Sequence, residues 1–88
     1  MEQKIQSITN NFEKKLIRKK SNLFSITPQS ASEAEVIISY KQVINNHLSI
    51  LEILHEESED TEYIYDNKDA IKHYFNELKE FIESIPDY

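Results

Sequence analysis

The segment IKHYFNELKEFIESI, residues 71–85, decides the fold class of this chain. Its apolar residues recur at steps of three and four, which places them on one face of an α-helix. They are Ile71, Tyr74, Phe75, Leu78, Phe81, Ile82 and Ile85. Pro86 follows directly and cannot continue the helical hydrogen bonds. A single amphipathic helix of this length is marginal in water, so other helices of the chain must cover this face.

Two starts are open for this last helix. The run Asp66-Asn67-Lys68-Asp69 offers N-cap residues and favours a start near Asn67. Ile64 lies one heptad before Ile71 and favours either a start at Thr61 or a separate short turn around it. We expect the helix to span about residues 67–85.

The N-terminal part of the chain predicts a helix over about residues 3–20. Ile5, Ile8, Phe12 and Leu16 form its apolar stripe. The cations of residues 14–20 follow at its carboxyl end, where the helix dipole favours each by roughly 0.3–1 kcal/mol.

A second helix is expected over about residues 31–57. Its apolar residues fill a wide arc, typical of a helix that contacts two others; they are Val36, Ile37, Tyr40, Val43, Ile44, His47, Ile50, Leu51 and Leu54. Thr27 with Pro28 offers one start, and the capping box that begins at Ser30 offers another. We favour the start near Ser30 to Ser32.

Together these segments predict an all-α fold, a small antiparallel three-helix bundle, in a single domain of residues 1–88. The chain has no glycine and no cysteine, so it lacks phosphate-cradling glycine loops, disulfides and thiolate metal sites. With no signal peptide or membrane-spanning run in the sequence, we expect a soluble, cytoplasmic protein.

Charge is segregated along the chain. Residues 1–26 hold six cations against two acids, whereas residues 27–88 hold 14 acids against four lysines. In the expected bundle, the basic residues 14–20 are largely neutralised by nearby acids, which are Glu33, Glu35, Glu80, Glu83 and Asp87. The opposite pole keeps an excess of carboxylates, and charged surfaces select the sign of the partner they meet.

We call this excess the acidic corner, and it is the candidate partner-binding site. Its residues are Glu52, Glu56, Glu57, Glu59, Asp60, Glu62, Tyr63, Tyr65 and Asp66. Glu56 and Glu57 lie at the carboxyl end of the second helix, where the dipole disfavours acids. Asp66 instead suits a helix N-terminus and is explained by capping. Tyr63 and Tyr65 either anchor a basic protein surface or cover the open end of the core.

The sequence offers little catalytic chemistry. Glu52 and His55 match the Glu-x-x-His pair of di-iron bundles, but only one copy is present, and His55 with Glu59 lacks a third zinc ligand. His47 lies within the apolar arc and is expected to be a hydrogen-bonded core histidine, and His73 is expected to be exposed. We therefore expect no enzyme, no catalytic residues, no cofactor and no metal site.

The order His55-Glu56-Glu57, an acidic loop, Tyr63-Ile64-Tyr65 and then an amphipathic helix loosely resembles the specificity region of colicin DNase immunity proteins. That family is likewise small, acidic and helical. The resemblance is limited to this region, and the adjacent tyrosine pair of that family is absent here. It implies that a surface of this composition can neutralise a basic protein.

These observations favour a non-enzymatic module, an inhibitor, immunity-type protein or adaptor, that docks a basic protein partner through the acidic corner. The alternatives are a self-associating structural or chaperone-like protein, with a homo-oligomer as one form, and an inhibitor that mimics nucleic-acid charge. A sequence pI of about 5.0 argues against direct nucleic-acid binding. The apolar stripe and six cations of the first helix are also compatible with a membrane surface, but the bundle needs that stripe for its core, so we expect no membrane association.

Overall fold

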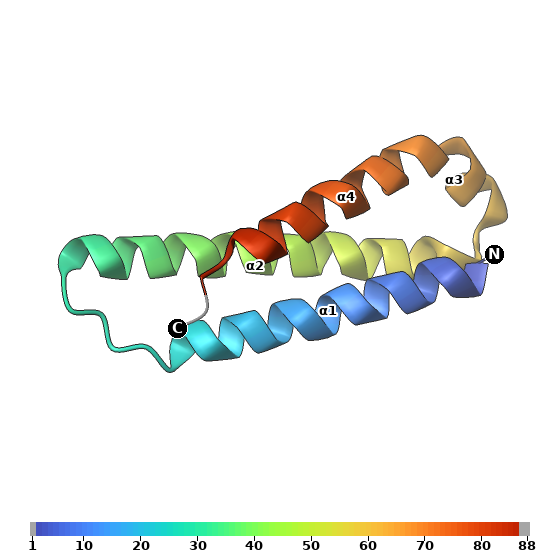
Figure 1. Cartoon of the computed structure of the whole chain (residues 1–88). Coiled ribbons are helices and arrows are strands. Elements are labelled where there is room, and N and C mark those ends of the chain that lie inside the picture. The colour runs from blue at the N-terminus through green and yellow to red at the C-terminus, as the bar shows by residue number, and fades with distance from the viewer. Residues whose placement is uncertain (1, 87–88) are drawn as a thin grey trace.

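The computed structural model describes residues 2–86 as an elongated helical protein measuring 49 × 18 × 17 Å (Figure 1). The elements are α1 (Glu2–Phe24), α2 (Ala31–Glu56), the 3-10 helix η1 (Glu57–Glu59), α3 (Thr61–Asp66) and α4 (Lys68–Ser84). The expectation of an all-α chain is confirmed. The described residues contain four α-helices, one more than expected, because the acidic connection forms the short helix α3.

Helices α1 and α2 lie side by side and run in opposite directions (Figure 1). Helix α4 returns over this pair. It starts away from α1 and α2 near α3 and approaches them toward its carboxyl end. Helix α4 is therefore closest to the other two at its carboxyl end and diverges from them at the end where α3 lies.

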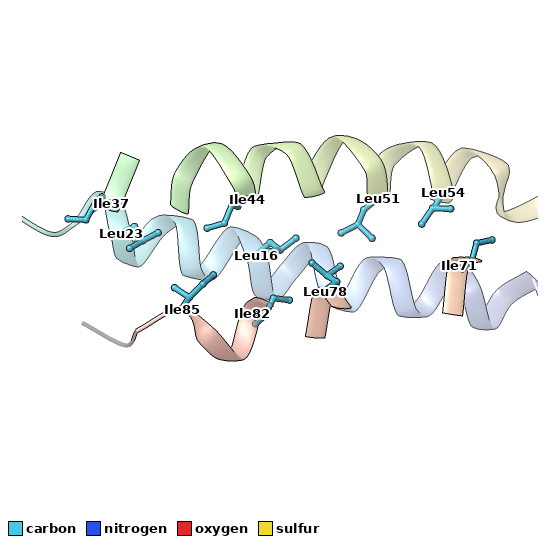
Figure 2. Close-up of a cluster of buried hydrophobic side chains, with 10 residues drawn as sticks. All are labelled: Leu16, Leu23, Ile37, Ile44, Leu51, Leu54, Ile71, Leu78, Ile82 and Ile85. Carbon is cyan, nitrogen blue, oxygen red and sulfur yellow. The ribbon is translucent and has the colours of Figure 1, made fainter. Parts of the chain in front are cut away.

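A line of buried leucine and isoleucine side chains runs through the protein (Figure 2). The buried apolar residues are Leu16, Leu23, Ile37, Ile44, Leu51, Leu54, Ile71, Leu78, Ile82 and Ile85. Within each long helix most of them are seven residues apart, as Ile37, Ile44 and Leu51 are in α2. A seven-residue repeat keeps one face directed at a neighbouring helix over many turns, which is the geometry of coiled-coil packing.

Two small hydroxyl residues continue this repeat at the diverging end. Thr9 lies seven residues before Leu16, and Ser58 lies seven residues after Leu51. Both are almost completely buried. Thr9 Oγ1 donates to the Gln6 carbonyl at 2.8 Å, and Ser58 Oγ donates to the His55 carbonyl at 2.7 Å. The core thus ends in groups whose polar atoms are satisfied within their own turns.

Helix α1 extends to Phe24, a turn beyond the expected end near Lys20. Leu23 lies one heptad after Leu16 and is 1% exposed, so burial of this side chain extends the helix. As a result the last turn of α1 contains no basic residue, and the helix dipole does not explain the lysines of residues 14–20.

The open choice at the start of α2 is decided in favour of Ser30. Its side chain accepts a hydrogen bond from the Glu33 amide at 3.1 Å, and Ala31 is the first helical residue. Glu33 Oε2 accepts a longer bond from the Gln29 amide, at 3.4 Å. Pro28 therefore lies in the connection before the helix.

The sequence left open whether the last helix starts at Thr61 or near Asn67, and the structure contains two successive helices in this region. Asp60 caps α3 by accepting a hydrogen bond from the Tyr63 amide at 3.0 Å, so the earlier start at Thr61 belongs to α3. Helix α4 begins at Lys68, close to the expected start at Asn67. Asn67 occupies the cap position but bonds backward, through Nδ2 to the Tyr63 carbonyl at 2.9 Å, and so links the two helices.

The buried repeat predicts a large difference between two apolar residues of α2. Leu51→Ala should lower the free energy of unfolding by about 2–5 kcal/mol, because it leaves a cavity at a fully buried position. Ile38→Ala, at a side chain that is 53% exposed, should change it by no more than about 0.5 kcal/mol. Urea titration followed by circular dichroism measures both. Equal decreases in the free energy of unfolding for the two variants would contradict the placement of Leu51 in the core and of Ile38 at the surface.

Candidate functional site

The acidic corner lies at the diverging end of the protein, where α2 ends and η1, α3 and the start of α4 follow one another (Figure 1). Residues 52–69 contribute eight carboxylates to this end against the single cation Lys68. Glu52 and Glu56 belong to α2, Glu57 and Glu59 to η1, and the others to α3, its cap and the first turn of α4. Because these residues follow one another within a single stretch of the chain, all those that the sequence assigned to this site lie at the same end of the protein.

The backbone of the corner is held by two local contacts. Buried Ser58 anchors η1, and this turn packs against α1. Asp60 then caps α3, so its carboxylate has a structural role in addition to its charge. Because the turn is fixed at Ser58, the flanking side chains of Glu56 and Glu59 are directed to solvent, and both are exposed.

The carboxylates of the corner are unneutralised. Apart from half-buried Glu57, the seven carboxylate side chains of the corner are exposed, as is the neighbouring Asp69, and none makes an ion pair within residues 2–86. Asp66 is the last residue of α3, so the expectation that capping explains it is wrong. A carboxylate at a helix carboxyl end faces the unfavourable pole of the dipole, as Glu56 does at the end of α2.

The two tyrosines of the site differ in their environment. Tyr63 is half-buried and packs against the hydrophobic core, as expected of a side chain that covers the open end. Tyr65 is 79% exposed. Of the two, only Tyr65 presents most of its ring to a partner.

A groove beside the corner was not found from the sequence. It has a volume of about 640 Å³ and lies where α4 diverges from the first turns of α1. Its lining is Ile5, Ile8, Thr61, Ile64, Tyr65, Lys68, Ile71, Lys72, Phe75 and Asn76. Ile5, Ile8 and Ile71 lie on stripes assigned to the core, and only the divergence of the helices leaves space between them. No local sequence signal reports that divergence.

Lys20, one of the basic residues at the opposite pole, contacts an amide and an aromatic ring and not one of the expected glutamates. Asp87, which was also expected near these residues, lies outside the described part of the chain. Lys20 Nζ donates to Asn45 Oδ1 at 2.7 Å and lies 5.8 Å from the centroid of the Phe24 ring. Lys41 Nζ lies 3.8 Å from the same centroid. Two cations thus face one exposed aromatic ring, an arrangement that attracts through the quadrupole of the ring.

The chemistry proposed for His55 is limited by its surroundings. Its Nε2 lies 3.4 Å from Gln6 Nε2, and its Nδ1 is buried with no hydrogen-bond partner within the described residues. No three His, Cys, Asp or Glu side chains lie close enough together to hold a metal ion in that part of the chain. The Glu52–His55 and His55–Glu59 pairs therefore have no third ligand there.

His47 connects α2 to α4. Its Nδ1 lies 2.8 Å from the Tyr74 hydroxyl oxygen, and its ring packs on Phe81 with a centroid distance of 5.0 Å. Burial lowers the pKa of His47 below its ordinary value of 6.5, while the nearby Glu77 carboxylate acts in the opposite direction. Burial raises the pKa of Tyr74 to about 12, so this hydroxyl stays protonated at neutral pH. The expected hydrogen-bonded core histidine is confirmed.

His73 is exposed, as expected, and its Nε2 lies 2.9 Å from Glu77 Oε1. Its side chain is 75% exposed, so this pair is fully accessible to water and salt. His73, which lies one residue before Tyr74, is thus an exposed histidine that can be compared with the half-buried His47.

Within residues 2–86, no helix combines the length and the apolar character needed to cross a bilayer. Comparison with protein-family models, curated proteins and solved structures gave no match. Functional inference therefore depends on the geometry and charge of the corner and its groove.

The environment of His47 predicts a pH dependence of stability. Because its pKa is lower in the folded chain than in the unfolded chain, the unfolded chain binds more protons below pH 6.5. The His47 contribution should be complete above pH 6.5 and should be lost as the pH falls through the lowered pKa. Urea titrations between pH 7 and about 5.5 should show a steeper loss for wild type than for His47→Gln.

His73→Gln is the control, because it removes an exposed histidine and keeps the contact between His47 and Tyr74. It should retain the wild-type dependence on pH. If the free energy of unfolding depended on pH in His47→Gln as it does in wild type, the pH dependence would come from groups other than His47.

Proposed function

We propose that this protein is a non-enzymatic binding module that docks a basic protein surface through the acidic corner. The observation that carries the proposal is the set of exposed carboxylates, contributed by four successive elements and without an ion-pair partner in the described chain. Such a surface raises the association rate with a cationic partner and disfavours anionic ones. An antiparallel bundle of α1, α2 and α4 is the scaffold, and we place its action in the cytoplasm, in line with the cysteine-free composition.

The groove supplies the second half of the proposed interface. Protein interfaces place an apolar centre within a polar rim, and a few aromatic anchors carry most of the binding free energy. Tyr65 lines the groove, and the corner carboxylates of α3 adjoin it. We expect a partner that inserts one or two apolar side chains into the groove and sets its cations against the carboxylates.

The two lysines that line the groove are expected to set the orientation of the partner. Lys68 and Lys72 line it from α4, so the acidic surface ends on that side. When one side of a binding site is negatively charged and the other is positively charged, the main effect is to fix the orientation of a charged partner, and the gain in affinity is smaller. The cationic part of the partner should therefore lie over η1 and α3, away from α4.

The charge of the corner is tested by two matched triple variants. One changes the exposed residues Glu56, Glu59 and Glu62 to Gln, and the other changes the exposed residues Glu35, Glu80 and Glu83 to Gln. Both remove the same charge, and both leave the capping Asp60 intact. Immobilised wild type and the second variant should retain the same basic protein from a lysate of source cells at low salt and release it at high salt.

The corner variant should lower the association rate constant for that protein by at least about tenfold, as measured by biolayer interferometry. If both triple variants lowered the association rate constant equally, the effect would come from the net charge of the protein, and this would contradict a defined site. Release of the bound protein by duplex DNA would instead favour the nucleic-acid mimic.

The groove is tested separately with Tyr65→Ala. If Tyr65 is an anchor, the variant should weaken binding of the captured protein by about 2 kcal/mol or more, mainly through faster dissociation. Thermal melting should be almost unchanged, because the ring is 79% exposed. Tyr63→Ala should instead lower the melting temperature, since that ring packs on the core. Unchanged dissociation for Tyr65→Ala would exclude this anchor.

A further inference from the structure

Helix α2 carries an apolar face that the rest of the chain leaves uncovered. Val36, Val43 and Ile50 are 47%, 37% and 41% exposed, although each lies on the same helix as the fully buried Ile44 and Leu51. The three are seven residues apart. They therefore form a line nearly parallel to the helix axis, about 21 Å long at 1.5 Å per residue.

The shape of this face fits another helix. A groove of about 480 Å³ runs along it, lined by Ser32, Glu35, Val36, Ser39, Tyr40, Val43 and Phe81. Six of these residues belong to α2 and fall into two overlapping sets with the spacing i, i+3, i+4 and i+7. Four residues with this spacing form the hole that receives one side chain of a facing helix in knobs-into-holes packing. The small side chains of Ser32 and Ser39 leave these holes open.

The charges of the protein indicate which helix fits. From residue 36 to residue 51, α2 contains only one charged residue, Lys41, and this lysine lies over the Phe24 ring. Glu35 is the one carboxylate among the residues that line the groove, and it lies exposed near the amino end of α2. On a chain of net charge −6, most of this face can therefore meet a like-charged surface without burying a charge. A second copy of the chain has both this largely uncharged face and an exposed Ile50 to enter the hole.

The distribution of charge also sets the direction of pairing. The acidic corner lies at the carboxyl end of α2, and the basic residues 14–20 lie toward its amino end (Figure 1). A parallel pair would bring the two acidic corners together. An antiparallel pair keeps the two acidic corners apart at opposite ends of the dimer, which is the favourable arrangement.

We propose that two copies of this chain form an antiparallel dimer through the outer face of α2, about a two-fold axis close to Val43. This register places Ile50 of each copy against the hole around Val36 and Tyr40 of the other, so the contact is made twice and the assembly closes. The acidic corners then point to opposite ends of the dimer. The proposal does not depend on the proposed function of the corner.

The first test is the mass of the chain in solution as a function of concentration, measured by sedimentation velocity. Wild type should shift from one chain to two as its concentration rises. Val43→Arg should remain monomeric over the same range, because it sets two cations face to face at the axis. Ile38→Arg changes an exposed isoleucine of the same helix outside this face and should dimerise like wild type.

The second test uses the absence of native cysteine and does not require a charged substitution. Under mild oxidation, Val43→Cys should form a disulfide-linked dimer by itself. Val36→Cys and Ile50→Cys should crosslink when the two variants are mixed and poorly when each is alone, as an antiparallel pair requires.

Efficient crosslinking of Val36→Cys with itself would indicate a parallel pair and overturn the proposal. A wild-type chain that is monomeric at every concentration would also overturn it, and would leave this face to a helix of another protein. Loss of dimerisation in Ile38→Arg as well as Val43→Arg would show that α2 pairs through a different surface.

Discussion

The seven-residue repeat of buried side chains is the constraint on which the structure depends. In a straight α-helix, positions seven residues apart drift by only about 20° around the axis, and a slight left-handed supercoil removes this drift, so one side chain per two turns stays directed at the same neighbour. In α2 the repeat is Ile37, Ile44 and Leu51. Because α1 and α4 carry matching repeats, three helices of a chain of only 88 residues can bury a continuous core.

The site lies at one end of that repeat. There the buried positions of α1 and η1 are the small residues Thr9 and Ser58, and α4 diverges from α1 although Ile5 and Ile64 still pack on the core. The groove lies in this divergence, and the buried Ser58 holds η1 against α1. The backbone of the acidic corner therefore has a defined position beside the groove.

A second consequence concerns the width of the apolar arc on α2. Two helices cover only part of this arc, and the residues at its edge, such as Val36 and Ile50, stay exposed. A wide arc is usually taken to mean a central helix with two neighbours. Here it exceeds what α1 and α4 cover, and the proposed contact with a second copy of the chain would cover the remainder.

The sequence predicted most of the helical segments and failed at particular positions. The repeat of Ile71, Leu78 and Ile85 is long and regular, and the helix it predicts lies within about a residue of α4. The prediction missed the last turn of α1, because lysine at position 19 interrupts the stripe before Leu23 resumes it. Residues 61–66 were left open between a turn and a helix, since their short length gives almost no periodicity.

The sequence by itself determined the helical class, the apolar stripes and the charge of the corner, because each of these depends on the order and spacing of residues along one helix. Only the tertiary structure decided that Tyr65 is exposed while Tyr63 is half-buried, that Lys20 and Lys41 share the ring of Phe24, and that a groove lies between α1 and α4. These features depend on the angle and distance between helices. That geometry follows from how side chains of different helices fit together, which no pattern within a single helix specifies.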